Sequence, residues 1–235
     1  SPKFAKNYAV GSWYDTMLPV LCKTYGGDSE GSRVWFGPWE THFLLAEAAL
    51  YGWNAGTTAK AAYEQGIRTS FENFGVSQYV DAYLQSEDYN RVGVSVKFSH
   101  TEEPTSFTAN YVNGYTNVAG TTTYEYPNAA MALYKGGKLN DQLTKIITQK
   151  YLALFPMSNE AWTELRRTGY PKLFPVLNPD EGDGSINEGD MIRRIPWVPS
   201  DPIALGMVEN SGVPALGGPD EQATRLWWDV DAPNF

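Results

Sequence analysis

The chain has 235 residues, of which 42% are hydrophobic and 19% charged, a composition typical of a folded globular protein. A formal net charge of -9 at pH 7 argues against nucleic acid and anionic membrane surfaces as partners, because both select for basic patches. The single cysteine, Cys22, excludes an internal disulfide, and with only two histidines the sequence predicts no metal centre.

Aromatic residues are unusually frequent, with 8 Trp, 15 Tyr and 10 Phe, or 14% of the chain. Buried rings are ordinary core material. Exposed rings can also stack on the C–H faces of sugars. The composition therefore raises carbohydrate binding as a hypothesis beside simple packing.

Residues 1–37 are turn-rich and predict a loop-rich lead-in. Two helical faces follow, separated by the break "GWNAG" at 52–56. The first face consists of Trp39, Phe43, Ala46 and Leu50, and the second of Tyr63, Ile67, Ser70 and Phe74. Two helices of this length with a short turn predict an antiparallel, tetratricopeptide-type helical hairpin over 38–75. Such a unit cannot bury its own face, and no second copy is found, which favours a truncated chain.

A variable insertion is expected over 76–137. "VSQYVDAYLQ" favours a short helix, and the alternation in "RVGVSVKF" predicts a half-buried strand. Asn113-Gly114 between β-type residues predicts a β-hairpin, and "TTTYEYP" adds an extended piece.

Residues 138–235 form the expected C-terminal region, which opens with a helix over 138–155. Its apolar stripe consists of Leu143, Ile147, Tyr151 and Leu154. The helix in "SNEAWTELRRTGYP" has a predicted N-cap at Ser158, two arginines in its last turn and a left-handed stop at Gly169. After residue 174 the chain is rich in Pro, Gly and Asp with little periodicity, and long structured loops are predicted. The expected fold is mostly α with minor β.

Four segments in this order resemble the C-terminal part of the SusD/RagB family of nutrient-binding lipoproteins from Bacteroidetes: "LLAEAALYGWNAGTTAKAAYEQGI", "ITQKYLALFPMSNEAWTELRRTGYPKLFP", "RRIPWVPSD" and "GGPDEQATRLWWD". Family members are about twice this long. The resemblance implies that the preceding part carries a lipid-modified cysteine and most of the helical repeats.

The resemblance also implies an architectural role for "EAWTELRRTGYP". Trp162 would pack the connection, and Arg166 and Arg167 would bind loop carbonyls or acids through their planar guanidinium groups. Trp227 and Trp228 are expected to seal the chain end against the core.

By the same resemblance, the protein is expected to sit at the outer membrane surface, held by the lipid anchor, as a lid on a SusC-like TonB-dependent transporter. It would capture oligosaccharides, or peptides in some members, without chemistry or cofactors. Aromatic type and loop context give the candidate ligand-binding residues: Trp13, Tyr14, Asp28, Arg33, Trp35 and Phe36, followed by Tyr115, Tyr124 and Tyr126.

An enzyme remains the alternative hypothesis. A glycoside hydrolase needs two carboxylates roughly 5 to 9.5 Å apart, and 27 Asp and Glu residues do not single out a pair. His42 and His100 offer no credible Ser-His-Asp arrangement, and no phosphate-binding loop is present. The acidic segment 178–190 fails the EF-hand spacing and predicts a solvated loop.

Overall fold

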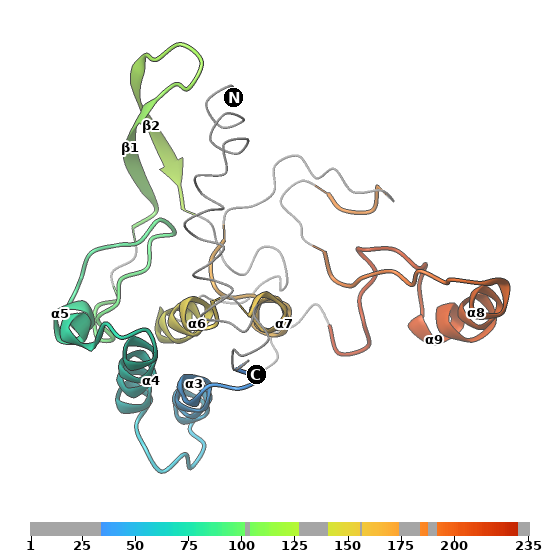
Figure 1. Ribbon diagram of the computed structural model, residues 1–235, viewed down its shortest axis with the longest axis horizontal. Helices are drawn as coiled ribbons and strands as arrows, with labels where there is room; N and C mark the ends of the chain where they lie inside the picture. Colours follow the sequence, from blue (N-terminus) through green and yellow to red (C-terminus); the bar gives the residue numbers. More distant parts are fainter. Residues whose placement is uncertain are drawn as a thin grey trace.

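The computed structural model describes residues 34–101, 104–126, 141–155, 157–173, 184–187 and 192–229. In these ranges the chain is mainly helical, with one two-stranded sheet (Figure 1). The prediction of a mostly α fold with minor β is confirmed. The elements are α3 (Pro38–Leu50), α4 (Ala59–Asn73), η1 (Ser77–Tyr79), α5 (Val80–Leu84), β1 (Ser106–Val112), β2 (Ala119–Glu125), α6 (Asp141–Ala153), α7 (Ser158–Thr168), α8 (Pro202–Met207), η3 (Val208–Gly212) and α9 (Val213–Leu216).

The helical hairpin of α3 and α4 lies where the sequence predicts it. The start of α4 is fixed by Thr58, whose hydroxyl accepts a hydrogen bond from the N–H of Ala61 at 3.2 Å. The helices approach closely because Gly66 on α4 lies beneath the ring of Phe43 on α3. A Cβ at position 66 would lie 2.9 Å from that ring. Of the predicted faces, only Phe74 is clearly misplaced: it follows the last residue of α4 and is 40% exposed.

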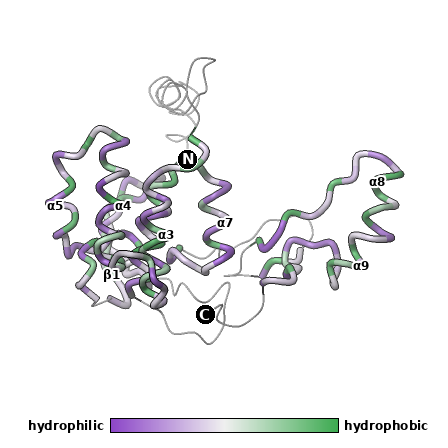
Figure 2. The backbone as a smooth tube through the Cα atoms, turned by 90° about the horizontal axis from the view of Figure 1, so that it is seen from below, coloured by the Kyte–Doolittle hydropathy of each residue, from purple (hydrophilic) through white to green (hydrophobic). Residues whose placement is uncertain are grey.

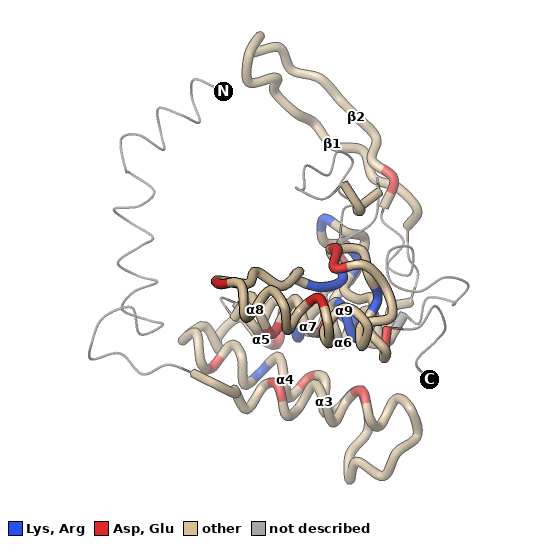
Figure 3. The backbone as a smooth tube through the Cα atoms, turned by 90° about the vertical axis from the view of Figure 1, so that its right-hand side faces the viewer, with Lys and Arg blue, Asp and Glu red and all other residues tan. Residues whose placement is uncertain are grey.

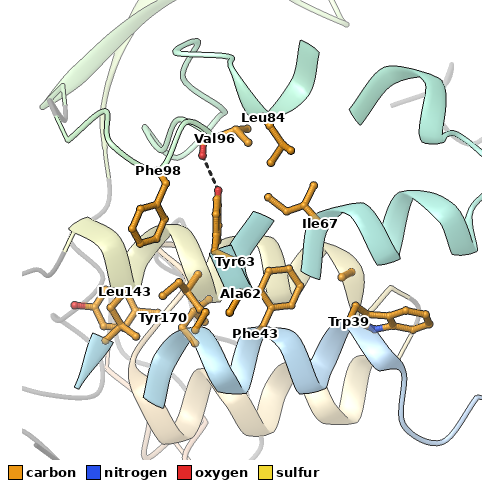
Figure 4. Packing of buried hydrophobic residues seen from close by; sticks show 14 of the residues in the cluster. Trp39, Phe43, Ala62, Tyr63, Ile67, Leu84, Val96, Phe98, Leu143 and Tyr170 are labelled. Carbon is orange, nitrogen blue, oxygen red and sulfur yellow. Dashed lines mark hydrogen bonds between the residues drawn. The ribbon is translucent and has the colours of Figure 1, made fainter. Parts of the chain in front are cut away.

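The helix α6 packs across the hairpin and completes the core (Figure 4). Ile146 and Ile147 are fully buried, and Leu143 is 7% exposed. On the other side of α4, the hydroxyl of Tyr63 donates to the carbonyl oxygen of Val96 at 2.6 Å. The core thus joins α3, α4 and α6 with the loop after α5.

The predicted strand at 92–98 is wrong. This segment is a turn in which the side-chain oxygen of Asn90 accepts the N–H groups of Val92 and Val94, both at 3.0 Å. Val94 and Phe98 are still buried, as the alternation requires. Ser95, between the alternating valines, is buried as well, at 2% exposed, and within the described ranges this backbone has no neighbouring strand to pair with.

The β-hairpin predicted at Asn113-Gly114 is confirmed. Strands β1 and β2 pair antiparallel in a register that sets Tyr111 opposite Gly120 and Phe107 opposite Tyr124. The connection is a longer loop, 113–118, organised by Asn113, whose side-chain oxygen accepts the N–H of Tyr115 at 2.9 Å. In Figure 1 the hairpin projects away from the helical body.

The helical segment 202–216 was not expected, because the sequence predicts only loops after residue 174. Asp201 caps α8 by accepting the N–H groups of Ile203 and Ala204, both at 2.9 Å. Figures 1 and 2 show α8 and α9 set apart from the helical body. A membrane span needs about 20 mostly apolar residues, and none of the described helices provides such a segment.

Candidate functional site

Two of the candidate aromatic residues are presented at the start of α3. Trp35 is 87% exposed and Phe36 is 57% exposed. The loop that carries them ends at Gly37, whose N–H donates to the carboxylate of Glu40 at 2.9 Å, while the N–H of Glu40 donates back to the carbonyl of Gly37 at 3.0 Å. This reciprocal capping box fixes the direction in which the chain enters the helix.

Glycine is required at position 37 because the indole of Trp39 lies against its Cα, where a Cβ would collide with the ring. Pro38 in the first turn restricts the backbone further. The exposed rings of Trp35 and Phe36 therefore project from a short, well-anchored entry segment.

Glu40 is 2% exposed, so the anchor is a buried carboxylate. Burial is the largest influence and raises the pKa of Glu40 above its ordinary value of 4.5, as do the charges of Glu160 and Glu164. The hydrogen bond from Gly37 and the charge of Lys150 act in the opposite direction. The charge of Lys150 thus attracts the carboxylate of Glu40 toward α6, whereas the two glutamates of α7 repel it.

The three tyrosines predicted on the β-hairpin have different environments. Tyr115 lies in the loop and is 80% exposed. The ring of Phe107 stacks on Tyr124 and on Tyr126, with centroids 5.1 and 5.2 Å apart. Tyr126 also lies against Gly93, where a Cβ would come within 2.8 Å of its ring. Tyr126 therefore packs the base of the hairpin onto the body, and its ring is less available than that of Tyr115.

The structure does not bring the two groups together. In Figure 1 the β-hairpin projects from one end of the helical body, and α3 lies at the other. The remaining candidates, Trp13, Tyr14, Asp28 and Arg33, lie outside the described residues.

Helix α7, which carries most of the segment "EAWTELRRTGYP", is bound to the core by ion pairs. The guanidinium of Arg167 donates to both carboxylate oxygens of Glu47, at 2.8 and 2.7 Å, and to Glu164 at 2.8 Å. Glu164 also pairs with Lys150 of α6 at 2.8 Å. Burial would raise the pKa of Glu164, but the hydrogen bonds and charges of Arg167 and Lys150 outweigh it and lower the pKa. Figure 3 marks the charged positions along α3, α6 and α7.

The ends of α7 differ in how well they were predicted. Gly169 ends the helix with a φ of 75°, as expected. The N-cap prediction is wrong: Met157 occupies that position, and Ser158 is the first helical residue, so no side chain caps the helix.

The two tryptophans near the chain end have opposite roles. Arg166 lies between Trp162 and Trp228, 4.4 and 5.1 Å from the two ring centroids. Trp228 therefore packs as predicted. Trp227 is 90% exposed, so the expectation that it seals the chain end is wrong. Adjacent residues in a turn face different directions, and contact with Arg166 leaves Trp227 facing outward.

A serine and a histidine meet in the turn after α5, a contact that the sequence did not indicate. Ser95 Oγ lies 2.9 Å from His100 Nδ1. Ser95 is 2% exposed, and its hydroxyl accepts a hydrogen bond from Lys145 Nζ at 2.7 Å. Buried and engaged in this way, the hydroxyl binds α6 to the turn and does not face a substrate. Within the described ranges, no cluster of His, Cys, Asp and Glu is suited to a metal ion.

Comparison with known proteins places this architecture in one class. The family model described as "SusD-like: Susd and RagB outer membrane lipoprotein" matches residues 21–229. The chain therefore belongs to the SusD/RagB family, and the family resemblance seen in the sequence is confirmed.

Solved structures of SusD homologues agree. A chitin-binding homologue from Flavobacterium johnsoniae is 39% identical, with a TM-score of 0.59 over 84% of this chain and 36% of its own. A homologue from Bacteroides thetaiotaomicron is 31% identical, with a TM-score of 0.61 over 86% of this chain and 39% of its own. One from Bacteroides vulgatus is 34% identical, with a TM-score of 0.55 over 84% of this chain and 36% of its own. The chain thus spans well under half of each. No curated protein matches it.

Proposed function

We propose that the protein captures nutrient oligosaccharides at the cell surface and transforms nothing. The main support for this proposal is the similarity to a chitin-binding SusD homologue, which is 39% identical over most of this chain. The exposed rings of Trp35 and Phe36 on an anchored segment support it, because flat exposed rings can stack on the C–H faces of sugars.

The captured glycan would be delivered to a SusC-like TonB-dependent transporter in the outer membrane. The family description, an outer membrane lipoprotein, supports this location. Attachment to the membrane would be through a lipid anchor, in keeping with the lipoprotein of the family description. Peptide capture on the same fold is the further alternative, and a glycan panel with a peptide mixture separates the two.

The test is binding and turnover in one experiment. The complete protein is incubated with chitin, xylan and starch oligosaccharides, and both affinity and new reducing ends are measured. Saturable binding with no new reducing ends supports capture. Accumulating reducing ends would show a glycoside hydrolase and overturn the proposal.

Trp35→Ala tests the site itself. It should weaken glycan binding while leaving the melting temperature unchanged, since the ring is 87% exposed. Trp53→Ala is the matched control, because Trp53 is also exposed, at 66%, but lies in the turn between α3 and α4. Equal affinity of Trp35→Ala and wild type would remove Trp35 from the site.

A further inference from the structure

The register of the β-hairpin gives its two faces different chemistry. Side chains alternate between faces along each strand, and directly paired residues share a face. One face carries the hydroxyl and amide pairs Thr108–Thr123, with oxygens 3.2 Å apart, and Asn110–Thr121. The other face is the aromatic one, and it consists of Phe107, Ala109 and Tyr111 with Gly120, Thr122 and Tyr124.

On the aromatic face, Tyr111 differs from the other rings. Phe107 stacks on Tyr124 and on Tyr126 at interplanar angles of 20° and 22°, so these three rings pack on one another. Tyr111 lies over Gly120 instead: a Cβ at position 120 would come within 2.8 Å of Tyr111 Cζ and Oη. Only glycine at position 120 allows the ring to rest on the opposite strand.

This placement prepares Tyr111 to stack. One side of the ring rests on the backbone of β2, and the residue is still 47% exposed. A ring that is already held loses less conformational entropy when a ligand packs on it than a freely rotating side chain does. Tyr115 in the loop is more exposed, at 80%.

A hollow lies beside the ring. It has a volume of about 350 Å³ and is lined by Asn110, Tyr111, Val112, Ala119, Gly120 and Thr121. Of the lining residues, Tyr111 and Gly120 belong to the aromatic face, whereas Asn110 and Thr121, joined by a hydrogen bond of 3.2 Å, belong to the opposite face. The half-exposed ring of Tyr111 therefore offers a flat apolar surface, which matches the apolar C–H face of a pyranose.

We propose that Tyr111, held over Gly120, forms a pyranose-stacking subsite on the β-hairpin, separate from the Trp35 and Phe36 loop. The ligand class is a neutral oligosaccharide, because none of the residues that line the hollow is charged. This inference rests on the proposed glycan-binding function and adds a second contact region to it. The sequence did not single out Tyr111, since only the cross-strand register reveals its glycine partner.

The test is calorimetric titration of the complete protein with the N-acetylglucosamine hexamer and with the hexamers of xylose and glucose. Tyr111→Ala should weaken binding of the recognised hexamer roughly three- to tenfold, the range expected for one aromatic contact. Tyr111→Phe should bind within about twofold of wild type, because the stacking face is kept. Gly120→Ala should weaken binding as Tyr111→Ala does, because the new Cβ displaces the ring.

Tyr79→Ala is the matched control, an exposed tyrosine on η1 that should leave affinity unchanged. Wild-type affinity of Tyr111→Ala would overturn the subsite and leave the proposed function standing. If Tyr111→Ala only lowered the melting temperature, Tyr111 would be a cross-strand packing residue, and the subsite would again be refuted. If the wild type bound no hexamer, both the subsite and glycan capture would be refuted.

Discussion

The pair of Arg167 and Glu47 gives the sharpest prediction about stability. Arg167→Ala removes two hydrogen bonds to Glu47, of 2.8 and 2.7 Å, and one to Glu164 of 2.8 Å. Glu164 keeps Lys150 as a partner, but Glu47, only 6% exposed, loses both of these hydrogen bonds. Stranding a buried carboxylate in this way costs about 3–5 kcal/mol.

The expected loss corresponds to a fall in melting temperature of roughly 6–20 °C for a chain of this size. Urea unfolding followed by circular dichroism measures the loss of unfolding free energy. The control is Arg68→Ala, which breaks a pair with Asp81 of 2.7 Å whose side chains are 42% and 84% exposed. That solvent-screened pair should be worth less than about 1 kcal/mol.

A second substitution tests the stated cause. If the cost of Arg167→Ala comes from an uncompensated charge, Glu47→Gln added to it should recover part of the lost stability. Should Arg167→Ala cost no more than Arg68→Ala, or Glu47→Gln only add to the loss, the reasoning is refuted.

Three further predictions concern α3, α4 and α7. Burial raises the pKa of Glu40 in the folded protein above its value in the unfolded chain. As pH falls, the folded protein therefore binds this proton before the unfolded chain does, and the contribution of Glu40 to stability rises as pH falls between the two pKa values. When unfolding free energy is measured from pH 7 to pH 4, the value for wild type should therefore rise relative to that for Glu40→Gln as pH falls. The same pH dependence for both proteins would contradict this. Gly66→Ala should cost about 1–3 kcal/mol, despite its better helix propensity, because its Cβ would lie 2.9 Å from the buried ring of Phe43; a gain in melting temperature would contradict it. Gly169→Ala should cost about 1–2 kcal/mol in chemical denaturation, because its φ of 75° disfavours a side chain; no change in stability would count against a left-handed stop.

The sequence predicted the helical body well because amphipathic periodicity is a local signal. Trp39, Phe43 and Ala46 are buried as their spacing requires, and the Asn113-Gly114 signal placed the hairpin. The division of the chain at 37, 75 and 137 stays a prediction.

Two of the errors, the strand at 92–98 and the packing of Trp227, share one physical cause, which is that pairing between distant residues is not a local signal. Alternation at 92–98 predicted burial of Val94 but could not tell whether a neighbouring strand existed. Adjacent tryptophans looked equivalent until Arg166 was found against Trp228 alone. For the same reason, the sequence revealed Tyr111 as an aromatic residue but not the glycine on which it rests.

The bond between Arg167 and Glu47 joins positions 120 residues apart. Contacts between α3 and α4 close only a short loop and can form early. The ion pair between Arg167 and Glu47 closes a much longer loop and is expected to form later. During synthesis the helical hairpin of α3 and α4 leaves the ribosome well before Arg167 does. Until then the carboxylates of Glu40 and Glu47 can remain hydrated, so the charges that are costly in the finished core help to keep the nascent hairpin in solution.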